Sequence, residues 1–154
     1  MSEEFCCSCS KSYVGPASAC PECREALERE QLKREGAQPA FLGYRGYPAT
    51  LCVSVNEEVV HGIPGERRIR EGDLVSIDAG CIVEGWYADA AVTVPVGTVS
   101  AEARRLTDTA RRALEQGIAR AVVGRRLSDI SHTVQQVVEQ EGFGVVRAFV
   151  GQAA

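Results

Sequence analysis

Two aspartates in the middle of the chain have the spacing that most clearly suggests chemistry. Asp78 and Asp89 lie in two β-prone segments, 74–79 and 87–94, which a tight turn can join into an antiparallel hairpin. If the hairpin turns about Val83-Glu84, the two aspartates stand directly opposite each other on one face, with their Cβ atoms ~5 Å apart. Like charges at that separation repel unless one is protonated or a cation lies between them. Carboxylate oxygens suit divalent metals, so the pair is a candidate metal site.

The spacing alone also allows a simpler arrangement, in which one aspartate caps a turn and the other faces water. A second candidate is His61, in the loop Val60-His-Gly-Ile-Pro64. Glycine and proline restrict such a loop, which can hold an imidazole at the edge of a site to donate a hydrogen bond or ligate metal. A solvated loop histidine is the alternative. His132, on a predicted helix, is expected at the surface.

Four of the seven cysteines form two pairs with metal-ligand spacing. Cys6-x2-Cys9 and Cys20-x2-Cys23, with ten residues between the pairs, resemble a small zinc knuckle or ribbon. In a reducing compartment such a cluster favours metal over disulfides. A cysteine-rich tail without metal is the other interpretation.

The elements that must position these residues alternate irregularly along the chain. Residues 1–23 show no helical or strand period, a helix runs from Pro21 to about Gly36, and a Gly/Pro/Tyr-rich loop follows to residue 49. A strand over 51–56 precedes the His61 loop and the hairpin, and another strand is predicted over 145–150. The mixture without a regular βαβ order favours an α+β fold.

Two helices are predicted after the hairpin, each preceded by a serine that can cap it. Ser100 begins the first and Ser128 the second, which Gly142 ends. The apolar positions at helical spacing are Leu106, Ala110, Leu114 and Ile118 in the first helix, and Ile130, Val134, Val137 and Val138 in the second.

Composition excludes several partners. A formal net charge of -4 gives no electrostatic reason to expect nucleic acid or an anionic membrane surface. No apolar run approaches the ~20 residues that span a bilayer, and the acidic start Met1-Ser-Glu-Glu lacks the apolar region of a signal peptide. We therefore expect a cytoplasmic protein without membrane or nucleic-acid recognition.

Four motifs in order make the chain resemble a known family. They are GAQPAFLGYRGYPATLC (36–52), SVNEEVVHGIP (54–64), GDLVSIDAG (72–80) and GWYADAAVT (85–93). Residues 36–151 resemble a type I methionine aminopeptidase, a peptidase family with the pita-bread fold. The resemblance implies an α+β, partial pita-bread (creatinase/aminopeptidase-like) fold. It also divides the chain into an atypical Cys-rich segment with a short helix, 1–35, and an incomplete catalytic domain, 36–154.

The resemblance further implies a function and a site. The family is a metallo-exopeptidase that removes the initiator methionine from nascent proteins by hydrolysis, with two divalent metal ions (Co, Mn, Fe or Zn). Its partners would be nascent peptide N-termini, at the ribosome. Asp78 matches a ligand of one ion, Asp89 a ligand that bridges both, and His61 a catalytic residue that contacts substrate. The positions that match the methionine pocket are Phe41, Tyr44, Tyr47 and Cys52, together with His61.

The sequence departs from the family at both ends. Gln152 stands where the family has a metal-binding histidine, and the chain ends at Ala154, before a second substrate-contacting histidine and two metal-binding glutamates. Two of five metal ligands remain, so we expect a poorly active fragment truncated at its C-terminus. At the N-terminus a zinc module competes with a frame shift, since one choice of codons for residues 5–18, read two nucleotides later, encodes a leucine-rich helix. The alternative function is a non-catalytic protein that binds zinc or peptide N-termini.

Overall fold

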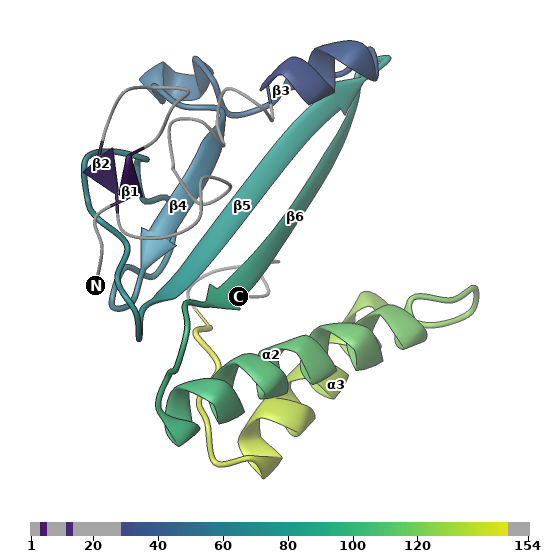
Figure 1. Cartoon of the computed structure of the whole chain (residues 1–154). Helices are drawn as coiled ribbons and strands as arrows, with labels where there is room; N and C mark the ends of the chain where they lie inside the picture. Colours follow the sequence, from purple (N-terminus) through teal and green to yellow (C-terminus); the bar gives the residue numbers. More distant parts are fainter. Residues whose placement is uncertain (1–3, 6–11, 14–28, 148–154) are drawn as a thin grey trace. The chain divides into compact units, whose positions relative to one another are not determined.

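The computed structural model describes residues 4–5, 12–13 and 29–147, which divide into two compact units, Met1–Val99 and Ser100–Ala154 (Figure 1). We call their described parts the β unit and the helical unit. The β unit holds the strands and loops, and the helical unit holds two α-helices. This separation of strands from helices agrees with the predicted α+β class. None of the described helices is both long enough and apolar enough to span a membrane.

The N-terminal region contains a minimal strand pair. β1 (Glu4–Phe5) pairs antiparallel with β2 (Ser12–Tyr13), although the sequence predicted no regular structure there. Two-residue strands are too short to leave a period in the sequence. The candidate zinc ligands Cys6, Cys9, Cys20 and Cys23 lie outside the described residues. Residues 29–34 are helical, and Gly36 has a φ of 71°, as expected of a helix stop.

The sheet of the β unit is built around β5 (Leu74–Val83). β6 (Trp86–Pro95) pairs antiparallel with β5 along the full length of β5 (Figure 1). Because β6 occupies one edge of β5, β4 (Leu51–Val55) and β3 (Gln38–Pro39) pair with different stretches of the other edge. The predicted strand over 51–56 and both hairpin arms are confirmed, and the arms extend further than predicted.

The predicted hairpin register is wrong by two residues. The turn lies at Glu84-Gly85, with φ of 50° and 84°, and not at Val83-Glu84. Positive φ at both central residues is the type I′ pattern, whose twist matches that of the flanking strands. The consequence is that Asp78 stands opposite Ala91, and Asp89 stands opposite Gly80.

The helical unit consists of α2 (Ala101–Arg120) and α3 (Leu127–Gln140). The Ser100 hydroxyl accepts a hydrogen bond from the backbone N–H of Ala103, which confirms the predicted cap of the first helix. Ser128 is not the cap of the second. That helix begins at Leu127, two residues earlier than a Ser128 cap implies, and the Asp129 carboxylate accepts from the backbone N–H of Arg126 at its N-terminus.

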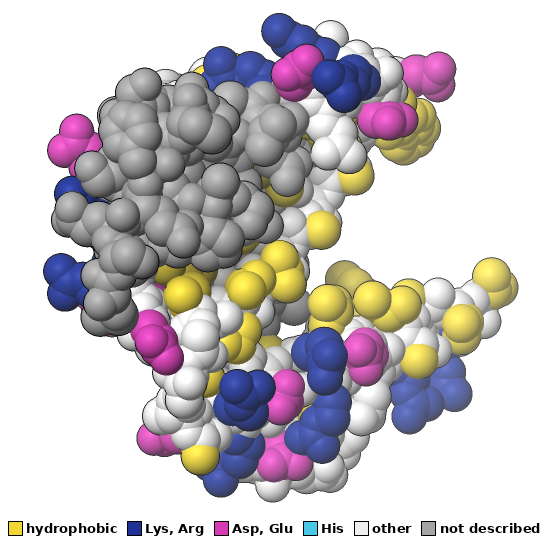
Figure 2. All heavy atoms as spheres, in the orientation of Figure 1, with side chains coloured by type: hydrophobic (Ala, Val, Ile, Leu, Met, Phe, Trp, Pro, Cys, Tyr) yellow, Lys and Arg dark blue, Asp and Glu magenta, His cyan; other side chains and the backbone are white. Residues whose placement is uncertain are grey.

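α2 buries a different face from the one predicted. Thr109, Ala113 and Gly117 are its buried residues, and a Cβ on Gly117 would lie 3.0 Å from a methyl carbon of Val134 on α3. The apolar positions Leu106, Leu114 and Ile118 are 44%, 39% and 64% exposed. Small residues let two helix backbones approach closely, which a row of leucines would prevent. Hydrophobic side chains accordingly line one side of this unit (Figure 2).

The last predicted strand, 145–150, is absent from the three of its residues that the structure describes. Residues 145–147 form no strand, and residues 148–150 lie outside the described part of the chain.

Candidate functional site

The two aspartates share one face of the β5–β6 hairpin. Residues directly opposite in an antiparallel pair point to the same side, and so do residues two apart on one strand. Asp78 therefore shares its face with Ala91, and so with Asp89 two residues earlier on β6. The aspartates are diagonal neighbours, not direct partners, yet their side chains still meet: burial first, then the hydrogen bond to Asp89 and its charge, raise the pKa of Asp78 to about 6.

One oxygen of this pair is left without a partner. Asp78 Oδ1 is buried and accepts no hydrogen bond from any described residue. An uncompensated buried carboxylate oxygen is costly, and a divalent cation is the partner that such an oxygen prefers. Asp89 is exposed, so solvent and dissolved ions can reach the pair of carboxylates from its side. The chemistry and burial of these two groups fit a divalent metal approaching from the side of Asp89.

Gly80 makes room beside the carboxylates. It stands opposite Asp89 and on the same face as Asp78. A Cβ built on Gly80 would lie 2.5 Å from the ring of Phe41, so this ring covers the position where a side chain would otherwise stand. Phe41 is thereby placed against the face that carries the two carboxylates.

Cys52, on β4, lies on the same face, and Tyr47, in the loop before β4, contacts it. Cys52 is the direct partner of Asp78 across the ladder and is 5% exposed. Burial raises the pKa of the Cys52 thiol, a hydrogen bond with Tyr47 lowers it, and the charges of Asp78 and Asp89 raise it further. Cys52 thus places a buried thiol on the face of the carboxylates.

His61 lies in an exposed loop and has a φ of 61°, in the left-handed region. The next residue, Gly62, is tied to β4, since its carbonyl accepts from the N–H of Val53. Tyr44 begins the short 3-10 helix η2 (Tyr44–Gly46) and is 63% exposed, with the guanidinium of Arg45 at 5.4 Å from its ring centre. The structure thus gathers Phe41, Tyr47 and Cys52 around the aspartates, whereas Tyr44 is exposed beside Arg45.

The site within the described residues is a partial one. No group of three or more His, Cys, Asp or Glu suited to a metal ion occurs in that part of the chain. Within those residues, Asp78 and Asp89 place two carboxylates on one face of the hairpin.

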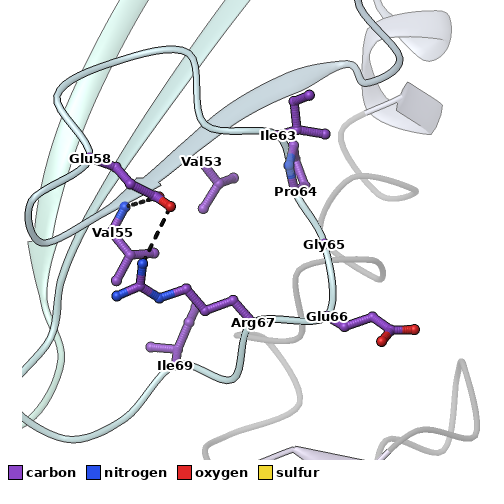
Figure 3. A pocket seen from close by; sticks show the side chains of 9 residues that line it. All are labelled: Val53, Val55, Glu58, Ile63, Pro64, Gly65, Glu66, Arg67 and Ile69. Atoms are coloured by element: carbon purple, nitrogen blue, oxygen red, sulfur yellow. Dashed lines mark hydrogen bonds and ion pairs between the residues drawn. The ribbon is translucent and has the colours of Figure 1, made fainter.

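A nearby pocket of about 250 Å³ belongs to the other face of the sheet (Figure 3). Val53 and Val55 line it, and they alternate along β4 with Cys52, which faces Asp78. At its rim Arg67 and Glu58 form an ion pair at 3.3 Å, and Glu58 also accepts from the N–H of Val55 at 2.8 Å. This pocket is therefore separate from the carboxylate site.

Two residues of the site were not predicted from the sequence. Gly80 follows Asp78 by two positions, and this period-2 spacing on a predicted strand could have placed it on the same face as the carboxylates. Ser54, whose hydroxyl accepts from the N–H of Gly62 at 3.0 Å, carries no signal of its own because that contact joins two separate segments.

Comparison with known proteins identifies a metallopeptidase family and relatives within it. A sequence profile described as metallopeptidase family M24 matches residues 9–153. Methionine aminopeptidase 1 of Bacillus subtilis (strain 168) is 44% identical over 141 residues, which cover 92% of this chain and 56% of that protein. The methionine aminopeptidase of Clostridium acetobutylicum is 45% identical over 128 residues, covering 82% of this chain and 51% of that protein.

Solved structures give the same result. The crystal structure of methionine aminopeptidase from Thermotoga maritima matches with a TM-score of 0.80 and 44% identity, over 86% of this chain and 54% of that one. Prolidase from Pyrococcus horikoshii, with 21% identity and a TM-score of 0.67 over 80% of this chain and 34% of that one, shares the fold. The chain spans about half the length of the methionine aminopeptidases it matches.

Proposed function

The chain belongs to metallopeptidase family M24, and from this premise we propose that it supplies one half of the two-metal site of a methionine aminopeptidase. Its fold is the corresponding part of the α+β pita-bread fold. The proposed reaction is hydrolytic removal of the initiator methionine from nascent proteins in the cytoplasm, at the ribosome. The observation that carries the proposal is the carboxylate pair on one face of the hairpin, with a buried oxygen of Asp78 left unpaired among the described residues.

Membership of a metallopeptidase family implies divalent metal binding. We propose that Asp78 and Asp89 would hold two divalent ions, of Co, Mn, Fe or Zn, with Asp78 as a ligand of one and Asp89 as a ligand of both. When bound, such ions would act as Lewis acids and lower the pKa of the water bound to them to about 7. The role of the aspartates is to provide negative charge on a rigid β-ribbon, where their mutual repulsion favours the metal-bound form.

The remaining residues would bind the substrate. Phe41, Tyr47 and Cys52 surround the carboxylates with aromatic and sulfur-containing surface, which suits the unbranched thioether of methionine. Tyr44 would complete this wall from the adjoining loop. His61 would donate a hydrogen bond to the substrate near the scissile bond, as a catalytic residue.

We expect little hydrolysis by the 154-residue chain itself, because its described residues hold no group of three metal ligands. Cleavage of a Met-Ala-Ser peptide at a rate that depends on added Mn²⁺ would contradict this expectation. A non-catalytic protein that binds zinc or peptide N-termini is the second candidate, and the motif Cys6-x2-Cys9 with Cys20-x2-Cys23 favours it.

Calorimetric titration with Co²⁺ distinguishes the two functions. The proposed function predicts binding that is lost in Asp78→Asn and in Asp89→Asn. Asp108→Asn, which removes an exposed carboxylate from α2, is the matched control and should bind as the unmodified chain does. Binding that survives both site substitutions but disappears in Cys6→Ser would support the zinc module instead.

A further inference from the structure

Gly62, the residue after His61, is fixed by hydrogen bonds to β4 and to the Tyr47 hydroxyl. Gly62 O accepts hydrogen bonds from Val53 N at 2.8 Å and from the Tyr47 hydroxyl at 2.9 Å. Gly62 N donates to the Ser54 hydroxyl at 3.0 Å. Both polar groups of this residue are therefore engaged, and its carbonyl has both acceptor positions filled.

The backbone at Gly62 packs directly against the backbone of β4 and leaves no room for a side chain. A Cβ on Gly62 would lie 2.2 Å from Val53 O and 2.8 Å from Val53 C, both backbone atoms that cannot move aside. Ser54 is 3% exposed, so its hydroxyl is held in the strand and meets Gly62 from a fixed position. The loop is thus anchored at one residue, immediately after an exposed histidine.

Tyr47 uses its hydroxyl hydrogen inside the protein. Besides Gly62 O, the hydroxyl oxygen lies 3.1 Å from Leu51 O, so the one O–H hydrogen is shared between two backbone carbonyls of different segments. The hydroxyl joins the first residue of β4 to the loop that carries His61. Only the ring of Tyr47 then remains for contact with a substrate side chain.

We propose that Tyr47 and Ser54 are positioning residues that hold the backbone at His61-Gly62, and so fix where the imidazole of His61 is presented. The proposal rests on the proposed function for the role of His61 in substrate binding. The anchoring of the loop itself can be tested without metal or substrate. His61 has a left-handed backbone, which a residue other than glycine keeps only when its surroundings impose it. The hydrogen bonds of Gly62 hold the backbone next to His61 and so maintain this conformation.

The chain is well suited to a test by NMR because it has two histidines, one in each unit. His61 reports on the loop and His132, on α3, is an internal reference. Tyr47→Phe removes the hydroxyl and keeps the ring, and Ser54→Ala removes the acceptor for Gly62 N. Tyr44→Phe and Ser76→Ala are the matched controls. The first alters the exposed neighbouring tyrosine, and the second breaks the Ser76–Thr93 hydroxyl contact of 2.8 Å on the same sheet face.

In the metal-free protein, we expect the Gly62 amide to exchange with solvent about tenfold faster in Ser54→Ala, since one hydrogen bond is lost. The imidazole signals of His61 should move towards random-coil values in Tyr47→Phe, while those of His132 stay in place. The two controls should leave both readouts unchanged even where they lower the melting temperature. Unchanged Gly62 exchange and His61 signals in both test variants would overturn the proposal.

Added Mn²⁺ then separates this proposal from the proposed function. Broadening of the His61 signals is expected in the unmodified chain, and it should weaken in Tyr47→Phe if the position of the imidazole depends on the Tyr47 hydroxyl. If Mn²⁺ broadens neither histidine, the metal assignment fails, whereas the metal-free exchange data still decide whether Tyr47 and Ser54 anchor the loop.

Discussion

At the scale of single residues, Asp78 shows a conflict between binding and stability. Its pKa is raised to about 6, chiefly by burial and then by Asp89, from an ordinary value near 3.9. A group whose folded-state pKa is raised contributes stability fully below its unfolded pKa and loses that contribution as the pH rises through the folded pKa. Asp78 therefore lowers the stability of the metal-free chain progressively from about pH 4 to above pH 6. A bound cation would reverse this effect.

Asp78→Asn should consequently stabilise the metal-free protein at pH 8, because an amide of the same shape carries no charge to desolvate. The measurement is the melting temperature by calorimetry at pH 8 and pH 4, with Asp108→Asn as control. The increase should be present at pH 8 and largely absent at pH 4, where the Asp78 carboxyl is itself neutral. A melting temperature lowered equally at both pH values would contradict the assigned pKa shift.

Gly62 is the second residue at which the surrounding atoms predict how a substitution changes the stability of the protein. Gly62→Ala should reduce the free energy of unfolding by about 2 kcal/mol or more, because the added methyl group meets the backbone of Val53 at 2.2 Å. Gly65→Ala in the same loop is the control, since its nearest neighbour is Ile63 O at 3.8 Å, and should change it by less than about 0.5 kcal/mol. Urea denaturation measures both, and equal effects would argue against the close contact.

At the scale of elements, the sequence predicts which strands and helices exist better than how they pair. The alternation of apolar residues identified both hairpin arms, but the register depended on a turn in which Glu84 takes a φ of 50°. Glutamate gives no signal for that conformation, which asparagine and glycine favour. Likewise, the helical period located α2 but could not show that Thr109, Ala113 and Gly117 form its buried face. Small residues carry little hydrophobic signal.

Glu84→Asn should therefore stabilise the β unit, by about 0.5–1 kcal/mol, because asparagine tolerates the left-handed region that glutamate occupies at a cost. Glu66→Asn, at an exposed loop residue whose φ is not positive, is the control and should have little effect. Chemical denaturation provides the comparison. If Glu84→Asn destabilised the chain, the type I′ turn, and with it the corrected register of the aspartates, would be in doubt.

At the scale of the whole molecule, the motifs sufficed to identify the family and the part of its fold that is present. The hairpin spacing placed both aspartates on one face, and the shift of two residues in the register keeps that face but makes the contact diagonal. The chain spans about half the length of the relatives it matches. In keeping with this, Trp86 and Val92 on β6 are 82% and 56% exposed, and apolar side chains of α2 are exposed in the helical unit (Figure 2).

The central claim is that Asp78 and Asp89 together bind a divalent cation. Anomalous diffraction from crystals soaked in Mn²⁺ tests it most directly. The account predicts an anomalous peak within ~2.5 Å of carboxylate oxygens of both aspartates, which is the range of metal–oxygen bonds. Crystals that hold Mn²⁺ only elsewhere, with the Asp78 oxygen still unliganded, would contradict it.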